Sequence, residues 1–81
     1  MRLEIVNPGT TEAFVAALAG CGVKLPLALH SQEVGSVIDA DNHEVFVVDV
    51  HSELSDEVTE YIASWLVLAV NTCGGFKAVR T

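Results

Sequence analysis

The chain has 81 residues and a formal charge of −7, because eleven acidic residues stand against only four basic ones. Its length predicts one domain over residues 1–81. The 51% hydrophobic content excludes the disordered class. The acidity argues against nucleic acid or anionic lipid as a direct ligand, since phosphate binding requires Lys and Arg.

No segment has the pattern of a targeting or membrane-spanning sequence. The N-terminus lacks the apolar region of a secretory signal, and the longest apolar stretch, residues 61–70, has about half of the ~20 residues that a membrane helix needs. Cys21 and Cys73 lack the spacing of a metal motif. These features predict a cytoplasmic protein with reduced thiols and no membrane contact.

The first third of the chain predicts a strand and a helix. Residues 3–6 read as a short strand or extended arm that ends at Pro8. Thr10 or Thr11 is expected to cap a helix that continues through residues 13–19. Two glycines directly after this segment are expected to end the helix.

The middle of the chain predicts an edge strand and a hairpin. Residues 27–30 follow a proline, which favours a brief strand at a sheet edge. Residues 34–38 and 44–50 are expected to pair across a turn at 39–43, where Asp and Asn suit turn conformations. The second hairpin strand is apolar on both faces over residues 45–48, which favours a central position in the sheet.

The main helix is predicted from Ser55, its N-cap, to about Asn71. The residues expected to face the core are Val58, Ile62, Trp65 or Leu66, and Ala69. Because residues 65–70 are apolar on every side, this half of the helix is expected in the core or in a contact between subunits.

The expected order of elements is β-α-β-β-β-α, with an optional last strand after Phe76. This order predicts an α+β fold, in which an antiparallel sheet of three to four strands carries two helices packed on it.

Acidic residues without neighbouring cations are the most distinctive feature of the sequence. Residues 25–76 contain nine acids and no Lys or Arg. Most lie near the hairpin turn or the start of the main helix, and seven are candidate partner-binding residues: Asp39, Asp41, Glu44, Glu53, Asp56, Glu57 and Glu60. Turn and cap preferences explain about half of these acids. We therefore expect an acidic surface that faces a basic protein partner, with a merely solubilising face as the alternative.

Two aromatic residues on the main helix have two interpretations. Tyr61 and Trp65 lie one turn apart and are either core residues or, together with Leu68, anchors of a dimer interface.

Nothing in the sequence indicates a catalytic, cofactor or metal site. His30, His43 and His51 carry metal-ligand atoms, as do nearby aspartates, but their spacing matches no metal motif. Both cysteines adjoin glycines at helix ends, and no Gly-rich phosphate loop precedes a helix. We therefore expect no enzymatic activity and no cofactor.

Two segments carry a resemblance to a class of small proteins. They are VIDADNHEVFVV (residues 37–48) and EVTEYIASWLVLAVN (residues 57–71). They resemble small phage and prophage proteins with an "I-x-D-A-x-G-x-x-V" hairpin, an acidic helix start and an "I-A-x-x-(I/L)-V-x-A-V-N" helix. The resemblance covers residues 37–71, and Asn42 stands where Gly is usual.

Some proteins of that kind are anti-CRISPR proteins, several of which present a DNA-like array of carboxylates. The resemblance implies a phage-derived inhibitor of bacterial defence in the cytoplasm of an infected or lysogenic host. Such an inhibitor would bind a basic nucleic-acid-binding surface of a CRISPR effector subunit by DNA mimicry. The alternative hypothesis is a non-enzymatic homodimeric structural or accessory protein that uses residues 61–70 as its interface.

Overall fold

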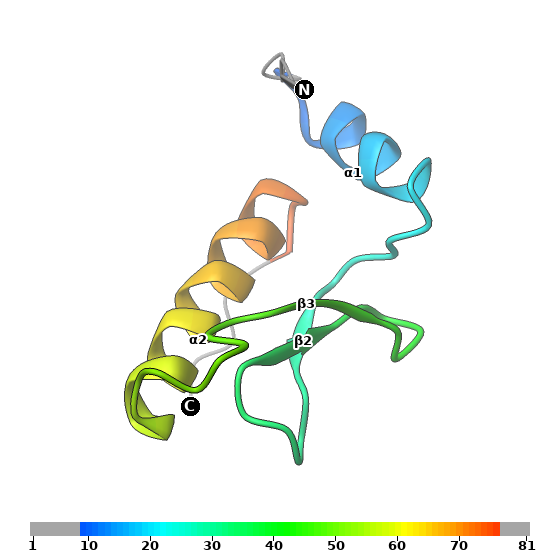
Figure 1. Cartoon of the computed structure of the whole chain (residues 1–81). Helices are drawn as coiled ribbons and strands as arrows, with labels where there is room; N and C mark the ends of the chain where they lie inside the picture. The colour runs from blue at the N-terminus through cyan, green and yellow to red at the C-terminus, as the bar shows by residue number, and fades with distance from the viewer. Residues whose placement is uncertain (1–8, 77–81) are drawn as a thin grey trace, which may run out of the picture.

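The computed structural model describes residues 9–76 and has the α+β architecture expected from the sequence. Figure 1 shows α2 along one side of the strands and α1 beyond the C-terminal end of α2. The elements follow in the order α1 (Thr11–Ala19), β1 (Ala28–Leu29), β2 (Ser36–Ile38), β3 (Glu44–Val47) and α2 (Asp56–Cys73). The strands expected over residues 3–6 and after Phe76 lie outside the described residues.

Hydroxyl side chains begin both helices, as the sequence predicts. Thr10 Oγ1 accepts a hydrogen bond from the Ala13 backbone N–H at 3.1 Å. Ser55 Oγ accepts one from the Val58 N–H at 3.2 Å. Each bond satisfies one of the backbone donors that have no partner at a helix start. Gly74 follows the last residue of α2, in agreement with the predicted end.

The described strands form one antiparallel sheet in the order β1-β2-β3. The expectation that residues 44–50 form a central strand is wrong, because β2 lies in the centre and β3 at an edge. Val37 pairs with Phe46 and Ile38 with Glu44, so Val45 is an extra residue in β3. Such a bulge interrupts the alternation of side chains, and both Val45 and Phe46 are half-buried. The apolar run therefore reflects a bulge and not a strand covered by two neighbours.

Asn71 of α2 binds the backbone just before β1. Leu27 N–H donates to Asn71 Oδ1 at 2.7 Å, and Asn71 Nδ2 donates to the Leu27 carbonyl at 2.9 Å. The side-chain amide thus forms the two bonds that a neighbouring strand would otherwise supply. This pair fixes the C-terminal half of α2 against the sheet.

The core is small and lies between α2 and the sheet. Its buried apolar residues are Leu25, Leu27, Val37 and Ala63, and half-buried residues of α1 pack against them. The α2 residues that enter it are Thr59 (3% exposed) and Ala63 (0%), with Val67 and Val70 half-buried.

The predicted inward face of α2 is therefore wrong. Val58, Trp65 and Leu66 are exposed, as is Ala69, and only Ile62 of the predicted set is half-buried. With 100° of rotation per residue, the buried face is about a third of a turn from the predicted one. Small residues allow a helix to approach a sheet closely, and this explains why Thr59 and Ala63 face inward in preference to the larger side chains.

Candidate functional site

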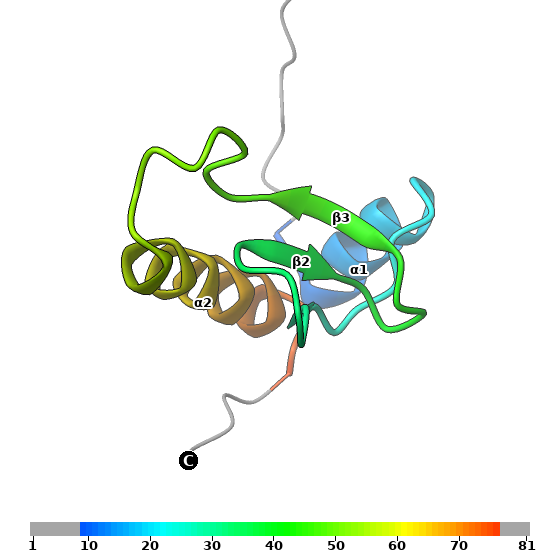
Figure 2. The same cartoon turned by 60° about the horizontal axis from the view of Figure 1, so that its bottom comes forward.

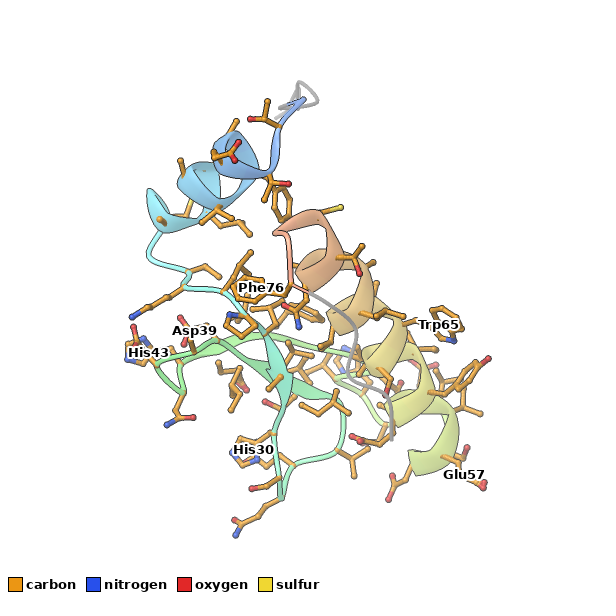
Figure 3. The ribbon with its side chains drawn as sticks, turned by 180° about the vertical axis from the view of Figure 1, so that it is seen from behind. His30, Asp39, His43, Glu57, Trp65 and Phe76 are labelled. Atoms are coloured by element: carbon orange, nitrogen blue, oxygen red, sulfur yellow. The ribbon has the colours of Figure 1, made fainter. Side chains whose placement is uncertain are left out.

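A group of exposed apolar side chains lies on α2 and in the loop just before it. We call this group the outer face of α2, and its residues are Leu54 in the loop and Val58, Tyr61, Trp65 and Leu66 in the helix. Tyr61 is 65% exposed and Trp65 is 56% exposed. Figure 3 shows the Trp65 side chain directed away from the strands. The alternative that both aromatics are core residues is excluded by these exposures.

The aromatic pair is ordered by its own contact. The ring centroids of Tyr61 and Trp65 lie 6.2 Å apart with an interplanar angle of 84°, an edge-to-face arrangement. This geometry is favourable for aromatic rings and places two large side chains in one rigid unit. Together the outer-face residues expose on the order of 500 Å² of apolar surface, which is within the range where patches on single chains are often functional.

Carboxylates surround only the N-terminal end of this face. Glu53, Asp56 and Glu57 are exposed and lie just before or within the first turn of α2. We call Glu53, Asp56 and Glu57 the acidic helix start. Lys24 is the only Lys or Arg in residues 9–76. The negative charge of these acids is favoured there by the helix dipole, so their position does not by itself require a partner.

The carboxylates of three of the seven predicted partner-binding acids accept hydrogen bonds within the described chain. Glu60 Oε1 accepts from the Gly35 N–H at 3.0 Å and holds α2 beside the start of β2. Glu44 is exposed, and its Oε1 accepts from Ser36 Oγ at 3.2 Å. Asp39 is only 3% exposed, so it does not contribute to a surface that a partner can reach.

Asp39 instead organises the hairpin turn. Its Oδ1 accepts from the N–H groups of Asp41 and His43, each at 2.9 Å, and its Oδ2 accepts from the Lys24 N–H at 3.2 Å. These bonds, chiefly the one from His43, lower the pKa of the Asp39 carboxyl below its ordinary value, while burial opposes the shift. Asn42 has φ 65°, the left-handed conformation that Asn tolerates in a turn.

The two groups of acids do not form one surface. β3 runs from the hairpin turn toward the loop before α2, so the turn and the acidic helix start lie at opposite ends of this strand. Figures 2 and 3 show this separation, with His43 and Glu57 on opposite sides of the molecule. Asp41 and Glu44 therefore lie apart from Glu53, Asp56 and Glu57.

Asp49, one of the nine acids of residues 25–76, holds the loop before α2 in place. Its Oδ1 accepts from the Glu53 N–H at 2.8 Å, and its Oδ2 accepts from the Leu54 N–H at 2.8 Å and from Thr59 Oγ1 at 3.3 Å. These bonds, with that from Leu54 the largest cause, lower the pKa of the Asp49 carboxyl. The loop before α2 is thereby fixed to the second turn of the helix.

Residues 9–76 form neither a metal-binding group nor a membrane-spanning helix. No group of three or more His, Cys, Asp or Glu side chains in this range is arranged to hold a metal ion. Cys21 and Cys73 are exposed free thiols. A search of the same residues for a helix with the length and hydropathy of a membrane span found none.

Comparisons with known proteins give no match. No family model fits the chain, and neither the curated proteins nor the solved structures include one that is significantly similar to it.

Proposed function

We propose that this protein is a non-enzymatic accessory protein that works as a homodimer joined through the outer face of α2. The observation that supports this proposal is the orientation of α2. Its small residues Thr59 and Ala63 pack on the sheet, while Tyr61 and Trp65 remain exposed. A face of this composition, with aromatic anchors at its centre, is typical of the buried centre of a protein interface.

The size of the outer face fits a small dimer interface. Two copies joined through it would bury on the order of 1,000 Å² in total, near the lower end of specific interfaces. The described core also contains only four buried apolar residues. A chain with so little core gains stability from covering additional apolar surface in a second copy.

Mass measurement in solution tests the dimer. We expect the wild-type protein to sediment as a dimer and Trp65→Asp to sediment as a folded monomer, because the new carboxylate would be buried without a partner at the centre of the interface. Val50→Asp is the matched control, since it places the same charge on an exposed apolar residue outside α2. A wild-type protein that remains monomeric up to its solubility limit contradicts the proposal.

A second candidate function, inhibition of a nucleic-acid-binding protein, is favoured by the acidic helix start. Glu53, Asp56 and Glu57 are exposed, and no cation lies in residues 25–76 to offset them. Carboxylates of this kind attract basic surfaces and accelerate association with them. For the anti-CRISPR hypothesis, the set of candidate partner-binding acids is thus reduced from seven to these three. Asp41 and Glu44 lie at the other end of β3.

Competition with DNA for purified CRISPR effectors tests this candidate. If the acidic helix start binds an effector, the triple variant Glu53→Gln, Asp56→Asn, Glu57→Gln should compete roughly tenfold less well at low salt, since three exposed charge pairs of about 0.5 kcal/mol each give that factor. The control variant Glu12→Gln, Glu33→Gln neutralises exposed acids elsewhere and should compete like the wild type. Equal competition by all three proteins would eliminate the candidate.

A further inference from the structure

The outer face of α2 continues as a stripe with the spacing of a helix-pairing seam. Within α2, the apolar residues on this side follow one another at intervals of three, four and three residues, namely Val58, Tyr61, Trp65 and Leu68. The first three are exposed and Leu68 is half-buried. This alternation of intervals keeps apolar residues on one side of a helix and is the pattern through which two helices pack lengthwise. The surface therefore fits a second helix, and in the proposed homodimer that helix is α2 of the other copy.

Side-chain size changes along the exposed side of α2. Trp65 lies near the middle of α2. On the N-terminal side of it the exposed seam residues Val58 and Tyr61 are larger than the exposed residues Ala69 and Thr72 on its C-terminal side. If two helices run in the same direction, large residues meet large ones and small residues meet small ones. If they run in opposite directions and cross at Trp65, Tyr61 and Val58 each meet a smaller residue, which allows close packing on both sides of the tryptophan pair.

Negative charge, like side-chain size, is greater toward the N-terminal end of α2 than toward its C-terminal end. Residues 61–76 contain no charged side chain, whereas residues 53–60 contain four acids. A parallel pair would bring the acidic starts of both copies together, which is destabilising for like charges. An antiparallel pair places each acidic start beside the uncharged half of the other helix. It also aligns the two helix dipoles in opposite directions, which is favourable.

From the seam, the size gradient and the charge gradient we infer that two copies pair with their α2 helices antiparallel and with Trp65 at the two-fold axis. In this arrangement Tyr61 of one copy faces Ala69 of the other, and Val58 faces Thr72. Trp65 is the only seam residue that meets its own symmetry mate. The inference rests on the proposed homodimer and adds the direction and register of its helices.

Disulfide trapping tests the direction of the helices. Cys21 and Cys73 are first replaced by Ser, so that no exposed natural thiol remains in the described chain. Val58→Cys and Thr72→Cys are then made in separate copies, the two copies are mixed, and a mild oxidant is added. We expect a disulfide-linked species of twice the chain mass in the mixture and little of it when either copy is oxidised alone.

The controls separate the possible results. Val50→Cys mixed with Thr72→Cys should give no excess of linked product, because Val50 is exposed but lies outside α2. Linked product from Val58→Cys alone and from Thr72→Cys alone, without an excess in the mixture, would show a parallel pair and overturn the inference. A protein that sediments as a dimer but yields no mixed product overturns it as well. A protein that sediments as a monomer overturns the proposed homodimer itself.

Discussion

At the scale of single residues, two aspartates illustrate how an acid can serve the fold and not a partner. Asp39 and Asp49 together accept six hydrogen bonds from the chain, five of them from backbone N–H groups. A carboxylate in such a setting is stabilised in its charged form. Their contribution to folding therefore depends on their remaining ionised.

This dependence predicts a loss of stability in acid. Both folded-state pKa values lie below the ordinary value of 3.8. The carboxylates therefore contribute fully at pH values above 3.8, and this contribution is lost as the pH falls from there through the lowered pKa values. We expect the free energy of unfolding, measured by urea titration, to fall in this range. The double variant Asp39→Asn, Asp49→Asn should have a lower free energy of unfolding than the wild type at neutral pH. This free energy should also fall less when the pH is lowered.

If the double variant loses as much stability in acid as the wild type, these two aspartates are not the cause.

The sequence suggested the turn at residues 39–43 and its Asn42 correctly, because turn chemistry is local. It did not reveal that Asp39 binds the Lys24 N–H, fifteen residues earlier, since that bond exists only once the chain has folded.

At the scale of elements, the packing of α2 on the sheet depends on the absence of a side chain at Gly35. This glycine has φ +83°, and a Cβ there would lie 2.6 Å from the Val48 carbonyl oxygen and 2.7 Å from Thr59 Cγ2. We expect Gly35→Ala to lower the free energy of unfolding by roughly 2–4 kcal/mol, from backbone strain together with overpacking. Chemical denaturation measures this loss.

Gly22 provides the matched control for Gly35. It has φ +85°, but a Cβ there would meet nothing within 4 Å. Gly22→Ala should therefore lower the free energy of unfolding by the backbone strain alone, about 1–2 kcal/mol. Equal losses at both positions would mean that the contact between Thr59 and the sheet is not close enough to matter.

The elements themselves were largely predictable, but the rotation of α2 was not. Caps and helix ends depend on neighbouring residues, so Thr10, Ser55 and Gly74 were sufficient to place the helix boundaries. The rotation is set by long-range contacts, namely the close approach at Thr59 and the Asn71–Leu27 hydrogen bonds. Hydrophobic periodicity pointed to the other side of the helix, because the large apolar residues are there.

At the scale of the whole molecule, folding and dimer formation should be coupled. A dimer dissociates when its chains unfold, so its stability increases with protein concentration, whereas that of a monomer does not. We expect the thermal unfolding midpoint of the wild type, followed by circular dichroism, to rise with concentration and that of Trp65→Asp to stay constant. A wild-type midpoint that is independent of concentration would argue against the dimer.

Whether the acids form one patch was the whole-molecule question most sensitive to topology, and the sequence left it open. The sequence places acids at a hairpin turn and at a helix start, but only the direction of β3 decides whether these two places meet. Because β3 carries the chain away from the turn before α2 begins, the hairpin turn and the acidic helix start lie at opposite ends of this strand. Local patterns contain no information about that separation.

The two faces of α2 share no residue. Thr59 and Ala63 pack on the sheet, whereas Tyr61 and Trp65 face outward. Substitutions on the outward side can therefore accumulate in evolution without harming the fold of a single chain, while the inward side stays constrained by packing. In the proposed dimer, a change of partner would then require substitutions on the outward side alone, and α2 would keep its attachment to the same small scaffold.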